Sequence, residues 1–248
     1  MFTQIKIRKI SEEVYEQIKD AILRGELRPG EKLPSERQMM QQMGVSRVPV
    51  REALQLLESM GFIETVQGGG SYVRSLVSDR VKDPLTHIMK ENVEKIIDLM
   101  EVRKHIESWS AYHAAERATS KDVASLEEII SEMKGFIDSG KTLPNRLDVD
   151  FHLTMSRCCH NTIQAHLMFT IHDVFSEYFN FLIEKICFNR RYQETIYEQH
   201  CNIYQAIRSR RCEEARDRTL EHLNFVDSAL RQILKGEEIE GMESPATN

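Results

Sequence analysis

Four side chains with metal-binding chemistry lie on predicted helices in the second half of the chain. Asp148 and His152 are four residues apart and therefore share one face of a helix. His200 and His222 each lie on the apolar face of a later predicted helix. Buried imidazoles without polar partners are costly, and one divalent cation bound by all four side chains would remove that cost. Imidazole and carboxylate ligands suit Zn²⁺, Ni²⁺ or Mn²⁺, whereas the alternative for each histidine is an ordinary core residue with a polar partner.

Three arginines near the N-terminus could bind a different kind of ligand. Arg47 and Arg51 are one helical turn apart, and a forked guanidinium group can pair with two acceptors on the edge of a guanine. Arg37 lies at the start of the preceding predicted helix, where it could contact a phosphate or a base. The alternative is that these are ordinary surface arginines, because most exposed arginines bind nothing specific.

The elements that would position these arginines follow the order of a winged helix-turn-helix. Apolar periodicity predicts helices over residues 10–24, 36–43 and 46–60. Only Gly44-Val45 separates the second helix from the third, so the two helices must cross steeply. One of them can then lie in the major groove of DNA while the other crosses the phosphate backbone.

Helix caps and a glycine-rich hairpin complete this predicted unit. Ser35 begins a capping box with the glutamine three residues later, and Ser46 is the expected cap of the third helix. Two short strands flank Gly68, Gly69 and Gly70, which can adopt positive φ angles at a hairpin tip. The two serines and the three glycines are therefore candidates for close contact with the DNA backbone.

The rest of the chain predicts an all-α antiparallel bundle, because long amphipathic helices with few glycines and prolines follow residue 84. The predicted fold class is therefore mainly α, with an N-terminal winged helix-turn-helix and a C-terminal helical bundle. The expected organisation is a DNA-binding domain (1–75), a linker (76–83), an effector-binding and dimerisation domain (84–235) and a flexible tail (236–248).

Composition narrows the class of protein. The net charge is −6, but residues 1–74 carry 11 basic and 10 acidic side chains, whereas the remainder carries 22 and 29. This balance excludes a non-specific nucleic-acid coat and still allows a small DNA-binding unit. The five cysteines are odd in number and form no CxxC pair, and no apolar run could span a membrane. The first residues also lack the apolar segment of a signal peptide, so we expect a cytoplasmic protein without a membrane partner.

The N-terminal motifs resemble a known family. Residues 33–37 (LPSER), 44–54 (GVSRVPVREAL) and 61–63 (GFI) resemble the signature of the GntR family of bacterial transcription regulators, with Val48 where Thr is common. The resemblance covers about 65 residues. It implies that Arg37, Arg47 and Arg51 contact DNA and that the wing enters the minor groove. It also implies a homodimer on a palindromic operator.

The second half resembles the FCD effector domain of the FadR subfamily. Metal-binding members of that subfamily use one Asp and three His, which assigns Asp148, His152, His200 and His222 as ligands of a divalent metal. Members that lack these histidines bind acyl-CoA, so their presence here disfavours that ligand. Arg103 lies in a segment that resembles the first core helix of the domain, where it could pair with the carboxylate of an effector. A salt bridge to an acidic neighbour is the alternative role for this arginine.

Three functions fit these features. We expect a ligand-responsive transcription regulator, a repressor, whose helical domain binds a divalent metal and a small carboxylate such as a hydroxy or keto acid. The second hypothesis is a metal sensor, in which the cation itself is the signal. The third is a metalloenzyme fused to a DNA-binding domain, against which no general base or nucleophile with suitable spacing is visible. We therefore expect that the protein is not an enzyme.

Overall fold

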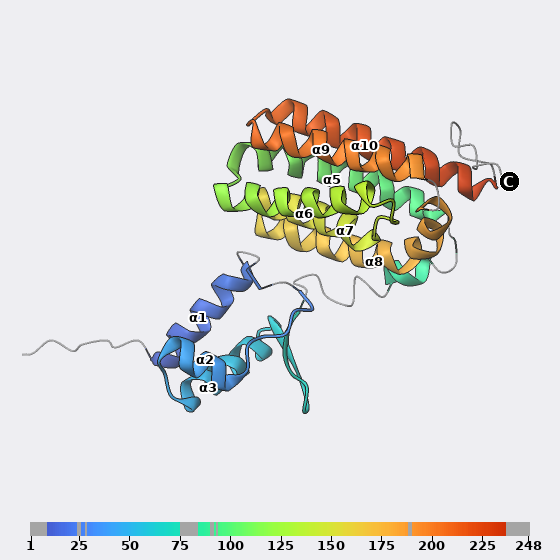
Figure 1. The fold of residues 1–248 in the computed structure, drawn as a ribbon. Coiled ribbons are helices and arrows are strands. Elements are labelled where there is room, and N and C mark those ends of the chain that lie inside the picture. The colour runs from blue at the N-terminus through green and yellow to red at the C-terminus, as the bar shows by residue number, and fades with distance from the viewer. Residues whose placement is uncertain are drawn as a thin grey trace, which may run out of the picture. The chain divides into compact units, whose positions relative to one another are not determined.

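The computed structural model describes residues 9–23, 26–27, 29–74, 84–89, 92, 94–187 and 190–236, and the side chains of residues 176–187 are not described. The chain forms two compact units, Met1–Leu76 and Val77–Asn248. The predicted linker, residues 76–83, and all but the first residue of the predicted tail, residues 236–248, lie outside the described residues. The described part of the chain is mainly helical with one two-stranded sheet, which confirms the predicted fold class (Figure 1).

The described residues of the first unit form three helices and a hairpin. They are α1 (Ile10–Leu23), α2 (Glu36–Met43), α3 (Arg47–Ser59), β1 (Ile63–Val66) and β2 (Gly70–Val73). Apolar side chains at helical spacing pack α1 against α3. Their shared core contains Val14, Ile18 and Ile22 from α1 together with Val50 and Leu57 from α3. This core fixes α3 from behind and leaves its opposite face in solvent.

The junctions around α2 follow from local chemistry. The Ser35 hydroxyl accepts a hydrogen bond from the amide of Gln38, and the Gln38 side chain accepts one from the amide of Ser35, as the capping box predicts. Gly44 ends α2 in the left-handed conformation, with φ of 66°, which favours glycine. Ser46 is the N-cap residue of α3, as predicted, although its side chain makes no cap hydrogen bond.

The wing is a tight antiparallel hairpin. Ile63 pairs with Val73 and Val66 with Gly70, so a three-residue turn joins the strands. Gly70 has a φ of 106°, a conformation that L side chains rarely adopt. Ile63 and Val73 are buried against the helices, and this anchors the base of the hairpin while its tip stays exposed.

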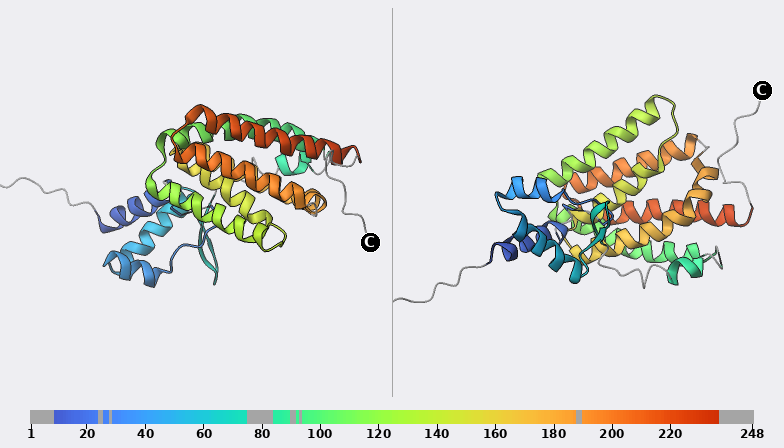
Figure 2. Two further views of the ribbon diagram at one scale, coloured as in Figure 1. Left: turned by 45° about the horizontal axis from the view of Figure 1, so that its top comes forward. Right: turned by 90° about the horizontal axis from the view of Figure 1, so that it is seen from below.

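The second unit is a helical bundle. Its helices are α5 (Lys95–Arg117), α6 (Ser120–Asp138), α7 (Asn145–Cys158), α8 (Thr162–Cys187), α9 (Arg190–Arg208) and α10 (Cys212–Leu234), and residues 84–89 are also helical. Figure 2 gives further views of α5, α9 and α10, which pack against one another. None of the described helices is both long enough and apolar enough to cross a membrane.

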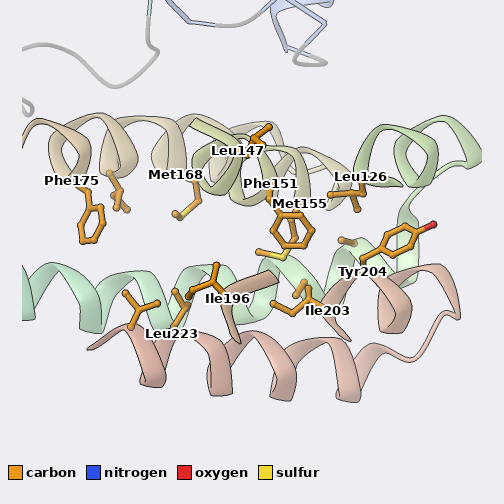
Figure 3. Packing of buried hydrophobic residues seen from close by; sticks show 14 of the residues in the cluster. Leu126, Leu147, Phe151, Met155, Met168, Phe175, Ile196, Ile203, Tyr204 and Leu223 are labelled. Atoms are coloured by element: carbon orange, nitrogen blue, oxygen red, sulfur yellow. The ribbon is translucent and has the colours of Figure 1, made fainter. Parts of the chain in front are cut away.

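One apolar core runs through the bundle and surrounds the polar cluster described below. Phe151 and Met155 of α7 are fully buried and face Ile203 of α9 across the interior (Figure 3). Met100 of α5 and Leu223 of α10 belong to the same core. Polar side chains inside such a core must find partners among one another, since water does not reach them.

Candidate metal centre and DNA interface

Three helices of the bundle bring the four predicted metal ligands together. Asp148 and His152 lie one turn apart on α7, His200 lies on α9 and His222 on α10. Nε2 of His152 is 3.2 Å from Nε2 of His222 and 3.4 Å from Nε2 of His200. Oδ1 of Asp148 is 3.5 Å from Nε2 of His200 and 3.9 Å from Nε2 of His152. One ligand atom from each residue fits within 4.8 Å of all the others.

The histidines of this cluster are fully shielded from water, whereas the Asp148 side chain is 26% exposed. Burial, followed by the neighbouring His222 and His152, holds the pKa of His200 well below its ordinary value. Burial, followed by His152 and Arg103, does the same to the pKa of His222. These imidazoles are therefore neutral near pH 7, which is the form that binds metal.

A hydrogen bond on the far side of His222 decides which nitrogen carries its lone pair. Nδ1 of His222 lies 2.9 Å from Oε1 of Gln199, an atom that only accepts hydrogen bonds. The ring proton must then sit on Nδ1, and the lone pair of Nε2 faces His152. The buried Nε2 atoms of His152 and His222, 3.2 Å apart, need either a proton or a cation between them. In addition, the Nδ1 atom of His200 is buried without a hydrogen-bond partner among the described residues. The residues thus fit a divalent cation in donor type, protonation and spacing.

A second layer of polar side chains surrounds His152. Glu107 of α5 is completely buried, with Oε2 2.5 Å from Nδ1 of His152 and Oε1 3.5 Å from Nε2 of His172. Burial raises the pKa of Glu107, but Arg103 and His152 outweigh that effect and hold it well below its ordinary value. Burial and then Arg103 lower the pKa of His172 to about 4.

Sequence reasoning missed Glu107 and left His172 without a role. A signal was present, because residues 100, 103, 107, 111 and 114 fall on one helical face. Arg103 and Glu107 are the two charged members of that otherwise small or apolar face. Opposite charges four residues apart at core positions indicate a buried pair.

Arg103 has features of both roles considered for it. Its Nε donates a 2.6 Å hydrogen bond to Oε1 of Glu107, and its guanidinium group lies over the ring of Phe175 with 4.4 Å to the ring centre. The same arginine also lines the pocket next to the histidine cluster. The salt bridge is therefore present, and pairing with an effector stays a prediction.

The pocket opens directly onto the cluster. Its volume is about 510 Å³ including the open mouth. The apolar part of its wall includes Ile196 and Val226. The polar part of its wall comprises Arg103, Asn145, Asp148, Tyr192, Gln193 and His222. A small polar molecule in this pocket would touch two candidate metal ligands, Asp148 and His222, and the guanidinium group of Arg103. Among the described residues, no cysteine belongs to a group that could hold a metal.

The predicted DNA-contacting residues lie on exposed parts of the first unit. The side chains of Arg47 and Arg51 are 66% and 58% exposed. Glu36 lies between them, because its carboxylate is 2.7 Å from Nε of Arg47 and 3.7 Å from Nε of Arg51. Arg37 is exposed at the start of α2. Arg47 and Arg51 can therefore reach an anionic ligand, while Glu36 holds them side by side.

The remaining predicted contacts lie at element ends. Ser35 and Ser46 are exposed at the N-termini of α2 and α3. Gly68 and Gly69 lie in the turn of the hairpin and Gly70 begins β2. The structure thus places all of them on the surface of the first unit, where a helix-turn-helix meets DNA.

Comparison with known proteins matches both units to family models. Residues 10–73 match the model of the bacterial regulatory proteins of the gntR family, and residues 98–225 match the FCD domain.

Full-length relatives are transcription regulators. The HTH-type transcriptional regulator LutR of Bacillus subtilis (strain 168) is 32% identical over 84% of this chain and 95% of the relative. The Glc operon transcriptional activator of Escherichia coli (strain K12) is 32% identical over 94% of this chain and 92% of the relative. The HTH-type transcriptional repressor NanR of Enterobacter sp. (strain 638) is 31% identical over 92% and 88%. These relatives are regulators and not enzymes, which argues against the metalloenzyme hypothesis.

Proposed function

The chain belongs to the gntR family of bacterial regulatory proteins and carries a C-terminal FCD domain, and we propose that this DNA-binding transcription regulator responds to a small carboxylate through a divalent metal bound by Asp148, His152, His200 and His222. The observation that carries the proposal is the pair of buried Nε2 atoms of His152 and His222, 3.2 Å apart, one of which must present a lone pair to the other. A bound Zn²⁺, Ni²⁺ or Mn²⁺ ion would supply a Lewis acid in the wall of the pocket.

The pocket supports a short, anionic effector. Arg103 offers a guanidinium group that pairs well with a carboxylate, and Asn145 and Gln193 place polar amide groups in the same wall. Ile196 and Val226 contribute to the apolar part of the wall. A hydroxy or keto acid of a few carbon atoms has this combination of groups.

The first unit supports the DNA-binding part of the proposal. Arg47 and Arg51 project from the exposed face of α3 and would read base edges in the major groove, while Arg37 would contact DNA from α2. Ser35 and Ser46 would contact the phosphate backbone, and the tip at Gly68, Gly69 and Gly70 would approach the minor groove. A single unit with so few contacts binds weakly, so we propose a homodimer on a palindromic operator.

The regulatory step is a shift between two states of the dimer. An effector changes operator affinity only if it binds one state more tightly than the other, and couplings of this kind typically change affinity by about 5–150-fold. We propose a repressor, which blocks transcription while it occupies its operator.

The test is the affinity of the purified protein for DNA from upstream of its own gene, measured by fluorescence anisotropy. L-lactate and pyruvate are the probes, and lactamide, which lacks the carboxylate, is the matched control. We expect a change of at least about 5-fold with an acid in Zn²⁺-loaded protein, and none with lactamide or after chelation. A change produced by Zn²⁺ alone would favour the metal sensor, and an affinity that no acid alters would contradict the effector proposal.

A further inference from the structure

Glu107 is a buried carboxylate that touches a candidate metal ligand from behind. Its Oε2 lies 2.5 Å from Nδ1 of His152, on the side of the ring opposite to the cluster. Its Oε1 accepts a 2.6 Å hydrogen bond from Nε of Arg103. Oε1 is therefore hydrogen-bonded to a guanidinium group, and Oε2 makes a close ion-pair contact with an imidazole.

A second metal ion at Glu107 is a poor explanation for this arrangement. Glu107, His152 and His172 also lie close enough together to hold a cation. However, a cation bound by Glu107 would lie next to the positive charge of Arg103, which repels it. The 2.5 Å contact between Glu107 and His152 also leaves no space for an ion between those two atoms.

The contact has a direct consequence for the proton on His152. A carboxylate beside Nδ1 favours a proton on that nitrogen, so the lone pair of the ring sits on Nε2. Nε2 of His152 is the atom that faces Asp148, His200 and His222. Gln199 fixes His222 in the same way through its own Nδ1. Partners of this kind orient metal-binding histidines and raise their basicity.

We propose that Glu107 is a positioning residue that keeps the ring proton of His152 on Nδ1 and presents Nε2 to the metal, with Arg103 balancing the charge of Glu107. This inference rests on the proposed metal site and adds a residue that is not itself a ligand. Because Arg103 also lines the pocket, it connects the effector site to Glu107 and through Glu107 to the metal ligand.

The first test is Zn²⁺ affinity, measured by competition with a chromophoric chelator. Glu107→Gln removes the charge and keeps the shape, and we expect it to weaken Zn²⁺ binding about 10–100-fold. Glu101→Gln on the exposed side of the same helix is the matched control, with affinity unchanged within about 2-fold. Wild-type affinity in a folded Glu107→Gln protein would overturn the proposal.

A second variant covers the possibility that Glu107→Gln does not fold, because it leaves Arg103 without its buried partner. The double variant Arg103→Met with Glu107→Gln removes both charges together, and we expect it to fold and to lose at least about 10-fold in Zn²⁺ affinity. A folded double variant that binds Zn²⁺ like the wild type would overturn the proposal. A wild-type protein that binds no divalent metal would overturn the proposed function itself, and this outcome is distinct from either variant result.

The last test does not involve metal binding. Long-range ¹⁵N–¹H spectra of the metal-free, histidine-labelled protein report which ring nitrogen of each histidine carries the proton, and the spectrum of His152→Gln identifies the signals of His152. We expect the proton on Nδ1. A His152 ring without a proton on Nδ1 would overturn the role of Glu107, whether or not the metal-free ring also carries a proton on Nε2 toward His222. A purely structural role would not fix a proton on Nδ1.

Discussion

Removal of one candidate ligand separates the metal from the packing around it. His200 is fully buried, its ring stacks on Phe151 with 4.4 Å between ring centres, and its Nε2 lies 3.4 Å from Nε2 of His152. His200→Ala therefore loses a metal ligand and also a ring stack, which is worth roughly 0.5–1.5 kcal/mol. The loss of packing is present with or without metal, so the difference between the two conditions isolates the contribution of the ion.

The size of that difference follows from linkage. An ion at about 100 times its dissociation constant stabilises the folded state by about 2.7 kcal/mol, and a 100-fold loss of affinity reduces this to roughly 0.4 kcal/mol. For a unit of this size, 1 kcal/mol shifts the melting temperature by about 2–4 °C. We therefore expect the ion to raise the melting temperature of the wild type by roughly 5–11 °C and that of His200→Ala by no more than about 2 °C.

The assay is thermal unfolding followed by circular dichroism, with Zn²⁺ or with a chelator. His105→Ala is the control, because His105 is an exposed residue of α5. It should keep the full increment of the wild type. An equal Zn²⁺-dependent increment in His200→Ala and the wild type would refute the ligand set.

Three further predictions concern DNA binding and the wing. Arg47→Ala and Arg51→Ala should each weaken operator binding by about 1–3 kcal/mol, measured by anisotropy, while Arg218→Ala on α10 should not; unchanged affinity in both would contradict the role of α3. The logarithm of operator affinity should fall linearly with the logarithm of salt concentration, by about 0.9 per phosphate neutralised, and a flat response would rule out the proposed interface. In urea unfolding, Gly70→Ala should lower the free energy of unfolding of its unit by about 1–3 kcal/mol, because Gly70 has a φ of 106°. Gly135→Ala inside α6 is the control and should raise the free energy of unfolding by roughly 0.5–1 kcal/mol. Equal effects of the two substitutions would contradict the backbone strain inferred at Gly70.

Local signals in the sequence were enough to predict the first unit. The capping box at Ser35 and the left-handed Gly44 each depend only on residues up to four positions away in the sequence. Both features can therefore be recognised without tertiary information. Ser46 shows the limit of that reasoning. Its position before α3 is correct, but whether its hydroxyl bonds to the helix depends on a side-chain rotamer that a sequence pattern does not determine.

The candidate site was only partly predictable, because one of its residues reaches the cluster through contacts between helices that are distant in the sequence. Asp148 and His152 are neighbours on one helix, and the faces of the later helices place His200 and His222 toward the core. Glu107 lies 45 residues before His152, and only the packing of α5 against α7 brings the two together. Long-range contacts of this kind do not follow from periodicity within single helices.

The central claim is that the buried histidine cluster is a metal centre, and anomalous diffraction from crystals grown with Zn²⁺ tests it most directly. The account predicts one anomalous peak per chain among Asp148, His152, His200 and His222. A peak beside Glu107 and His172 instead, or no peak at the cluster, would contradict it.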